Sequence, residues 1–446
     1  MTASPRIPAM DVLRGCAVMG IVWMNITAFA LPQGAYFNPA VAGPLSAGDK
    51  LFWAVSLILV DGKMRGLFAM LFGASMLLLV DREEMAGRDG RRSQHIRSAW
   101  LFLIGLAHYL LLWWGDILMI YAVVSLFALP LAGREPLALV KAAFLLFLLQ
   151  FLLSAGFVGS LHAWANAAAA PGADAAMREG YAAFIGALSD PGNAAVRADI
   201  ALHRGGFGSI AAHQLAGFPG DWLWSLLFTG METMGFMLLG MAMLKGGFLT
   251  GRWDAEQYRR TARHCFLIGL PPMAALAAWV ARSGFAPLPA LGTALVWSLP
   301  FRIPLAVGWA ALILWLFARV PHHALFARIG AAGRMTLSNY LGTSLVMTAL
   351  FYGWGLGLFG HVRPMLLPAF VIVIGGTIGA ALIALGRWDA LHWAALAAMA
   401  PPPEAPVVSL AMAIERRLVT LDETRVTVTA PPFRPQAQRA PPSLHA

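Results

Sequence analysis

The sequence predicts an all-α fold, a polytopic bundle of about ten transmembrane helices with both termini in the cytoplasm. Of the 446 residues, 59% are hydrophobic and only 12% are charged, where a typical soluble domain has about 25% charged residues. The mean hydropathy is +0.68, and long apolar segments recur along the chain. This composition excludes a soluble enzyme and a disordered chain. Two cysteines, Cys16 and Cys265, are too few for a disulfide scaffold.

Ten apolar segments are read as spans, because about 20 apolar residues cross a bilayer. They cover residues 10–31, 64–80, 98–115, 116–132, 137–161, 221–245, 264–282, 303–319, 335–358 and 364–386. The apolar run 51–60 is too short to span, and we expect an interfacial helix or half-helix that leads into the second span. The first segment contains Arg14 and is followed by no small-residue cleavage site, so it is not a cleavable signal peptide.

Basic residues determine the predicted orientation. With the N-terminus inside, the four inside loops carry 15 Lys and Arg residues, and the longer outside segments carry seven. An excess of basic residues marks cytoplasmic loops, and an even number of spans returns the C-terminus to the same side. The net charge of +10 is therefore explained by topology, and we expect no nucleic-acid partner.

The chain divides into four predicted regions. Residues 1–161 form N-terminal transmembrane helices, and residues 220–400 form a C-terminal transmembrane domain. Between them, residues 162–219 form an external segment, rich in Ala and Gly, in which we expect short amphipathic helices at the membrane surface. Residues 401–446 form a Pro-rich cytoplasmic tail for which we expect disorder at both flanks.

Seven ionisable side chains in or beside the predicted spans are the candidate functional groups. A charge near the centre of a bilayer costs about 2.5–3.5 kcal/mol on insertion scales, so such groups persist where they are paired, hydrated or functional. The predicted topology places Arg14 at the cytoplasmic end, His108 and Glu232 near mid-membrane, and the others toward the external side. Either a structural ion-pair network or a ligand cavity would explain why these residues are present. They are Arg14, Asp61, Lys63, Arg65, His108, Asp116 and Glu232.

His108 and Asp116 form the candidate catalytic pair. A carboxylate beside an imidazole holds it in one tautomer and raises its basicity, although spacing alone does not show that the two side chains meet. The alternative is a histidine that only donates a hydrogen bond between helices. No Cys/His spacing typical of a metal site occurs, and no nucleotide or hydrolase motif appears in a suitable context.

The ninth predicted span carries a polar stripe. Hydroxyl and small side chains commonly hold membrane helices together, which makes helix packing the favoured interpretation and a polar cavity the alternative. For the cavity, the candidate substrate-binding residues in this span are Asn339, Tyr340 and Ser344.

Several motifs together resemble the YeiB-like family of bacterial inner-membrane proteins. They are Asp-Val-Leu-Arg-Gly at 11–15, Gly-Lys-Met-Arg at 62–65, Gly-Leu-Ala-His at 105–108, Gly-Asp-Ile-Leu at 115–118 and Gly-Arg-Met-Thr-Leu-Ser-Asn-Tyr-Leu at 333–341. The resemblance covers about residues 6–395. It implies location in the bacterial inner membrane, a C-terminal domain of unknown function, and a fold similar to the transmembrane acyltransferase superfamily. That superfamily moves acyl groups from cytoplasmic CoA donors to external sugars, and the family itself is associated with transport.

The sequence departs from these relatives in two places. Many members of the superfamily carry a histidine in the first span after the arginine, where this chain has Asn25, and an amide cannot act as a general base. In the run 386–393, the proline of the family's last motif is missing, Asp389 replaces a Glu and Trp393 replaces an Arg.

Three functions follow as hypotheses. The first is acyl transfer from cytoplasmic acyl-CoA to an envelope lipid or glycan, in contact with membrane lipids. Arg14 would bind the donor phosphate, His108 with Asp116 would be the base, and further substrate-binding residues would be Asn25, Lys63, Arg65 and Glu232. The alternatives are a transporter or flippase of a small or lipid-linked anion, and a non-catalytic scaffold that binds partners through its tail.

Overall fold

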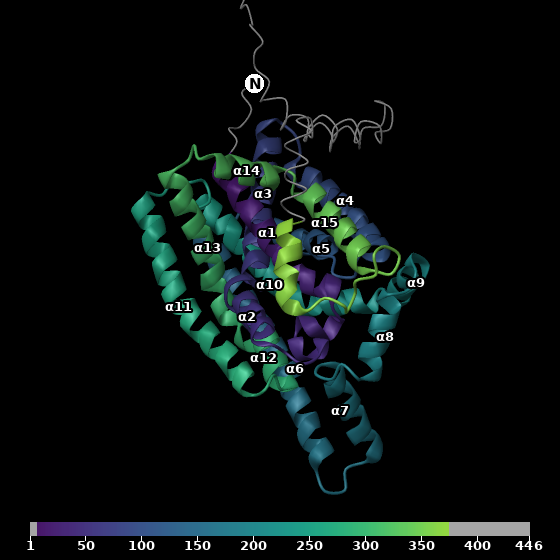
Figure 1. Cartoon of the computed structure of the whole chain (residues 1–446). Coiled ribbons are helices and arrows are strands. Elements are labelled where there is room, and N and C mark those ends of the chain that lie inside the picture. The colour runs from purple at the N-terminus through teal and green to yellow at the C-terminus, as the bar shows by residue number, and fades with distance from the viewer. Residues whose placement is uncertain (1–6, 374–446) are drawn as a thin grey trace, which may run out of the picture. The chain divides into compact units, whose positions relative to one another are not determined.

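The computed structural model describes residues 7–373, and all regular secondary structure in that range is helical (Figure 1). The predicted all-α class is therefore confirmed for this part of the chain, which lies within the compact unit of residues 1–376. The tail 401–446, most of the predicted span 364–386, and Asp389 and Trp393 lie outside the described residues.

Six helical stretches are long and apolar enough to cross a membrane. They are α1 (Pro8–Ala30), the stretch Ala47–Met85, α6 (Pro136–Ala169), α10 (Gly220–Lys245), α11 (Ala255–Arg282) and α13 (Leu299–Arg319). Each coincides with one predicted span, so the polytopic membrane character agrees with the prediction.

The count of ten spans is not confirmed. Helix α4 (Gly90–Leu111) has three arginines in its first half, and α5 (Leu118–Ala128) and α15 (Thr336–Phe351) have only 11 and 16 residues. At 1.5 Å per residue, these two helices extend about 16 and 24 Å, less than the roughly 30 Å of a hydrocarbon core. Ten spans and cytoplasmic termini remain predictions.

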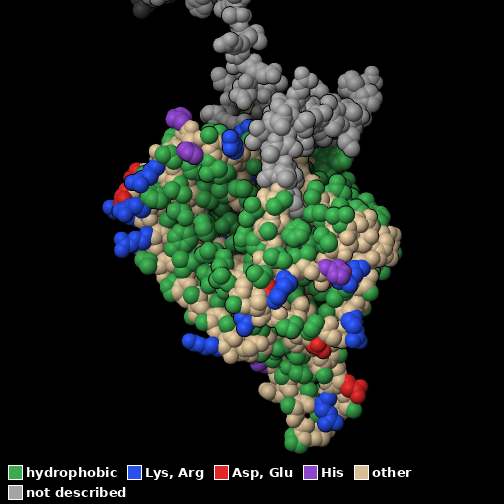
Figure 2. Space-filling view, in the orientation of Figure 1, with side chains coloured by type: hydrophobic (Ala, Val, Ile, Leu, Met, Phe, Trp, Pro, Cys, Tyr) green, Lys and Arg blue, Asp and Glu red, His purple; other side chains and the backbone are tan. Residues whose placement is uncertain are grey.

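The outward surface of the long helices is apolar. On α6 the exposed side chains include Phe144, Leu145, Leu148 and Leu152, and hydrophobic side chains cover most of the face in Figure 2. A soluble monomer rarely exposes an apolar surface of this extent, whereas a helix that faces lipid does so as a rule.

Two of the long helices are preceded by a short helix and a break. Helix α2 (Ala47–Val55) continues into the π-helical turn η3 (Ser56–Val60), and α3 (Lys63–Met85) follows after Asp61 and Gly62. Likewise, α12 (Pro287–Gly292) continues into the π-helical turn η5 (Thr293–Trp297), and α13 follows after Ser298. The short helix expected at 51–60 is thus present as α2 and η3.

The remaining helices complete the described part. Residues 162–219, predicted to be external, contain the short helices α7 (Ala175–Ala187), α8 (Ala194–His203) and α9 (Phe207–Gly217). Helix α14 (Ala324–Arg334) packs on α1, and α11 packs on α13. His203 of α8 stacks on Phe359 with ring centroids 4.5 Å apart, and this contact joins the external segment to the chain after α15.

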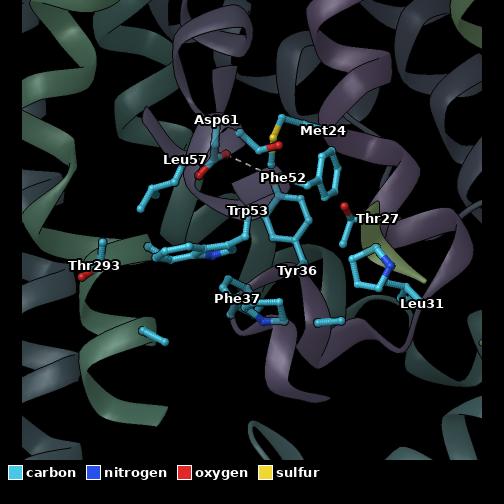
Figure 3. Close-up of a pocket in the computed structure, with 16 residues that line it drawn as sticks. Met24, Thr27, Leu31, Tyr36, Phe37, Phe52, Trp53, Leu57, Asp61 and Thr293 are labelled. Atoms are coloured by element: carbon cyan, nitrogen blue, oxygen red, sulfur yellow. Dashed lines mark hydrogen bonds between the residues drawn. The ribbon is translucent and has the colours of Figure 1, made fainter. Parts of the chain in front are cut away.

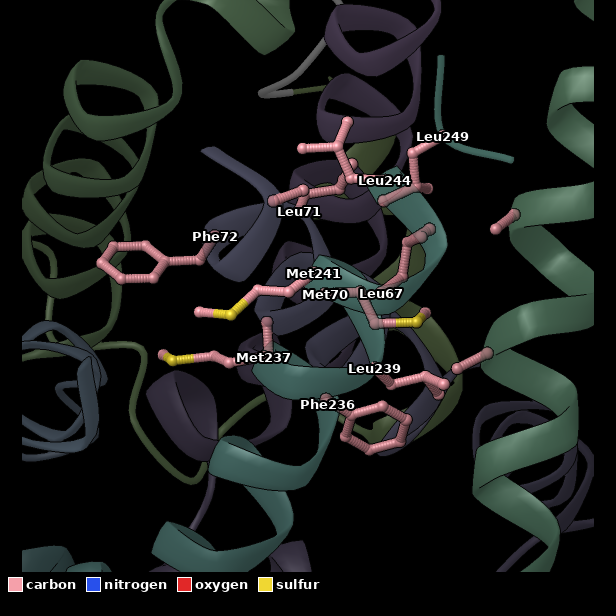
Figure 4. Close-up of a cluster of buried hydrophobic side chains, with 14 of the residues drawn as sticks. Leu67, Met70, Leu71, Phe72, Phe236, Met237, Leu239, Met241, Leu244 and Leu249 are labelled. Atoms are coloured by element: carbon pink, nitrogen blue, oxygen red, sulfur yellow. The ribbon is translucent and has the colours of Figure 1, made fainter. Parts of the chain in front are cut away.

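Helices α3 and α10 pack closely through glycines, around the methionine-rich cluster of Figure 4. A Cβ atom on Gly240 would lie 1.9 Å from the carbonyl oxygen of Met70, and one on Gly73 would lie 2.1 Å from that of Met237. The two glycines contact the opposite backbone reciprocally. Small residues that let backbones approach are a typical interface of membrane helices.

We expect Gly240→Ala to lower the thermal stability of the purified protein, because the added methyl group overlaps the backbone of α3. Overpacking of this kind costs about 1–3 kcal/mol. Gly156→Ala in α6 is the matched control, since no atom lies within 4 Å of its added Cβ, and it should leave the melting temperature unchanged or slightly higher. Equal melting temperatures for the two variants in detergent would contradict the close packing of α3 and α10.

Candidate functional site

Glu232 in the middle of α10 is bound by two arginines from different helices. Arg65 Nη2 of α3 donates to Oε2 at 3.0 Å, and Arg302 Nη1 of α13 donates to Oε1 at 3.4 Å. The side chains of Glu232 and Arg302 are only 4% and 6% exposed. The predicted residues Arg65 and Glu232 therefore meet, and Arg302 joins them although the sequence analysis placed it in an external loop.

The basic residues after the two helix breaks bond to the π-helical turns before them. Lys63 is fully buried, and its Nζ donates to the carbonyl oxygen of Leu57 in η3 at 2.5 Å. Arg302 donates in the same way to the carbonyl oxygen of Ala294 in η5. Gly62, with φ of +73°, leaves room for this arginine, since a Cβ there would lie 2.5 Å from Arg302 Cδ.

His108 and Asp116 form a buried pair. His108 Nδ1 lies 2.9 Å from Asp116 Oδ1, and the two side chains are 1% and 0% exposed. The second carboxylate oxygen accepts the backbone N–H of Met119 at 2.9 Å. Within the described part of the chain, His108 Nε2 is buried and has no hydrogen-bond partner. Asp116 thus orients the imidazole through Nδ1, while Nε2 forms no hydrogen bond with the described residues.

Tyr340 belongs to the same cluster. Its ring centroid lies 4.9 Å from that of His108, and its hydroxyl oxygen accepts the backbone N–H of Ile117 at 3.3 Å. Tyr121 lies five residues after Asp116, and its hydroxyl donates to the carbonyl oxygen of Arg65 at 3.2 Å. Tyr121 therefore lies between the His108 pair and the Glu232 cluster.

Arg14 contacts a different part of α3. Its Nη2 donates to Ser75 Oγ at 2.8 Å, and its Nη1 pairs with Asp11 at 3.3 Å. Arg97 of α4 lies over the ring of Phe72, 4.7 Å from its centroid, and is close enough to Arg14 for the two charges to repel. Two guanidinium groups thus lie together at the end of the bundle where α1 begins.

The remaining candidates make backbone contacts or none. Asn339 Nδ2 donates to the carbonyl oxygen of Ala332 in α14 at 2.9 Å, whereas Ser344 Oγ donates to that of Tyr340 within its own helix at 3.1 Å. Asn25 is half-buried, and its side chain forms no hydrogen bond with the described residues. Within residues 7–373, no group of three His, Cys, Asp or Glu side chains is arranged to hold a metal ion.

The sequence analysis missed Arg302, Arg97 and Tyr121. Arg302 follows Pro300 at the edge of an apolar segment and was counted with the loop. Arg97 was counted among the basic residues of a cytoplasmic loop, although it lies within α4.

Comparison with known proteins identifies the relatives of the chain. Uncharacterized protein YeiB of Escherichia coli (strain K12) is 34% identical over 382 residues, which cover 83% of this chain and 89% of that protein. The chain belongs to the YeiB family. Uncharacterized protein YxaH of Bacillus subtilis (strain 168) is 26% identical over 381 residues, which cover 80% of this chain and 85% of YxaH. The family model described as "Protein of unknown function (DUF418)" matches residues 243–385. No solved structure matches the chain.

The resemblance inferred from the motifs is thus confirmed at the level of the YeiB family. The names of these relatives state no reaction and no transported solute, so a function for this member has to be argued from its own side chains.

We expect Glu232→Gln to destabilise the protein strongly, because it leaves the buried Arg302 and the partly buried Arg65 without their shared carboxylate. Breaking a buried ion pair on one side typically costs about 3–5 kcal/mol. The control is Glu256→Gln, which removes surface pairs with Arg259 and Arg260 and should leave the melting temperature unchanged. If thermal unfolding in detergent showed both variants to be as stable as the wild type, Glu232 would not hold the three helices together.

Proposed function

We propose that this protein is a multi-pass inner-membrane enzyme that transfers an acyl group from cytoplasmic acyl-CoA to an envelope lipid or glycan. The observation that carries the proposal is the buried His108, held through Nδ1 by Asp116, while Nε2 has no hydrogen-bond partner among residues 7–373. When Nδ1 carries the proton and donates it in a hydrogen bond to the Asp116 carboxylate, the free lone pair of the neutral imidazole is on Nε2. This is the arrangement of a general base that awaits an acceptor hydroxyl or amine.

In the proposed reaction, His108 Nε2 takes the proton of the acceptor O–H or N–H group. The acceptor atom attacks the thioester carbonyl carbon, and the C–S bond breaks to release the CoA thiolate. The imidazolium then returns its proton to that thiolate, so that the enzyme is unchanged. Asp116 stabilises the imidazolium between these steps, and the Tyr340 ring beside His108 restricts how the acceptor can approach.

Arg14 is the proposed donor-binding residue, and the structure supplies Arg97 as its neighbour. Planar guanidinium groups bind phosphate oxygens through paired hydrogen bonds. A phosphate bound between these two positive charges would relieve their mutual repulsion, which favours this place for the phosphates of a CoA donor. Lys63, Arg65 and Glu232 are proposed to order the acceptor or to stabilise charge that develops during transfer, with both termini in the cytoplasm.

A transporter or flippase is the second candidate, and the two broken helices favour it. Helices interrupted near the middle of a bundle form the substrate sites of many secondary transporters, and here both breaks lie beside Glu232. In this case Lys63, Arg65 and Arg302 would belong to a path for an anion. A pure scaffold role would depend on the tail, which lies outside the described residues.

We expect His108→Ala to reduce acyl transfer by about 10²–10⁴-fold, the usual contribution of a general base. The assay follows radiolabelled acyl groups from acyl-CoA to lipid and glycan extracts by the full-length protein in proteoliposomes. His162→Ala is the control, because that ring bonds only the carbonyl oxygen of Val158 in its own helix. Unchanged transfer by a folded His108→Ala protein would remove the base from the mechanism.

Asp116→Asn tests the role of the carboxylate. We expect it to lower the transfer rate with little change in donor affinity, because an amide can bond the imidazole in the wrong tautomer. A large loss of donor affinity with an unchanged rate would instead make Asp116 a binding residue. Counterflow in sealed vesicles, with no acyl product from any acceptor, would favour the transporter.

A further inference from the structure

A narrow pocket lies between the two broken helices (Figure 3). Residues of η3 and its break form one wall, residues of α12 and η5 form another, and α1 with the segment 35–39 closes the remaining side. The cavity is small, about 40 Å³, well below the roughly 300–1,000 Å³ of sites for drug-sized ligands, so it has room only for a small group.

The lining of the pocket is aromatic and acidic. Tyr36, Phe37, Phe52 and Trp53 contribute four rings, and Figure 3 shows Tyr36, Phe52 and Trp53 grouped near the carboxylate of Asp61. Among the described residues that line the pocket, none is Lys, Arg or His.

The side-chain oxygens of the lining are hydroxyl and carboxylate oxygens, and two of them already accept a hydrogen bond. Tyr36 directs its hydroxyl proton toward Asp61 Oδ1 at 3.3 Å, and Ser56 Oγ already accepts from Trp23 Nε1 at 3.0 Å. Thr293 Oγ1 is buried and has no hydrogen-bond partner in the described part of the chain. A ligand that enters therefore meets a carboxylate, hydroxyl oxygens and ring faces, and it meets no cationic donor.

We propose that this pocket binds an organic ammonium group. A cation is attracted both to the carboxylate of Asp61 and to the negative faces of aromatic rings, which is how quaternary ammonium ligands are recognised. An anion would face Asp61 and is disfavoured. A neutral ligand of the same shape can fill the pocket but gains neither attraction. The ammonium group comes either from a lipid headgroup or from a free amine.

Lys63 limits the affinity of the pocket. Leu57 and Asp61 line the pocket and Lys63 does not, so its ammonium group, bonded to the Leu57 carbonyl, lies behind the wall. Asp61 attracts Lys63 electrostatically, and a bound ammonium ion would compete for the same carboxylate. Arg65 and Arg302 bond Glu232, but Asp61 also attracts Arg65 and both arginines act on Tyr36, so they too weaken the attraction for a bound cation. Removal of the Lys63 charge should therefore strengthen the binding of a cation.

This inference goes beyond the proposed acyl transfer, because an ammonium pocket serves a transporter as well as an enzyme. Binding is measured without turnover, so the pocket and the transfer reaction can fail separately.

The experiment uses the full-length protein in nanodiscs of phosphatidylglycerol, which contain no ammonium headgroup. Equilibrium dialysis compares choline with dimethylbutanol, its neutral carbon isostere. We expect choline to bind at least about tenfold more tightly, as a desolvated cation–π contact and a carboxylate imply. Equal binding of the two probes overturns the proposal. Dihexanoylphosphatidylcholine distinguishes the sources: tighter binding than choline assigns the site to a lipid headgroup, and weaker binding assigns it to a free amine.

Two variants that should change choline binding in opposite directions complete the test. Asp61→Asn should abolish the preference for choline, whereas Lys63→Met should raise choline affinity severalfold. Asp174→Asn, at an exposed residue far along the chain in the external segment, is the control and should bind as the wild type does. Thermal unfolding verifies that each variant is folded, and Thr293→Val replaces Asp61→Asn if that protein does not fold. Choline preference retained by folded Asp61→Asn, or weaker choline binding by Lys63→Met, overturns the proposal.

Discussion

The bonds between Glu232 and its two arginines are the constraint on which the rest of the described structure depends. A buried carboxylate without a partner costs several kcal/mol, so the burial of Glu232 in α10 requires cations from the neighbouring helices. Arg65 is the third residue of α3, and Arg302 is the fourth residue of α13. The first turns of both helices must therefore lie beside the middle of α10, and the breaks that precede them come to the same level.

The pocket follows from this arrangement. A chain that breaks its helix within a membrane bundle must satisfy the freed backbone groups, and this is possible only inside protein or beside a cavity. Lys63 and Arg302 satisfy one carbonyl of each π-helical turn. The opposite surfaces of the same turns, at Leu57 and at Ala294, are walls of the pocket. The basic residues that bond the two turns therefore lie directly behind two walls of the pocket.

The sequence was sufficient to predict the helical class and the six longest spans, because hydropathy is a property of consecutive residues. It also marked Arg65, Glu232, His108 and Asp116 as unusual. It could not pair them, since Arg65 and Glu232 are 167 residues apart and periodicity describes one helix at a time. His108 and Asp116 meet only because α4 ends at Leu111 and the chain turns back before α5. The short lengths of α5 and α15 were not predicted either, because their apolar character continues beyond the ends of the helices.

The His108 pair and the Glu232 cluster are mechanically connected through α5. Asp116 orients His108 and also bonds the first turn of α5 at Met119. Two residues further along that helix, Tyr121 donates to the backbone of Arg65. A movement of the Arg65 backbone must therefore break the Tyr121 bond or move α5. The carboxylate that orients His108 also bonds the start of the helix that carries Tyr121, so the two clusters share α5 as a common support.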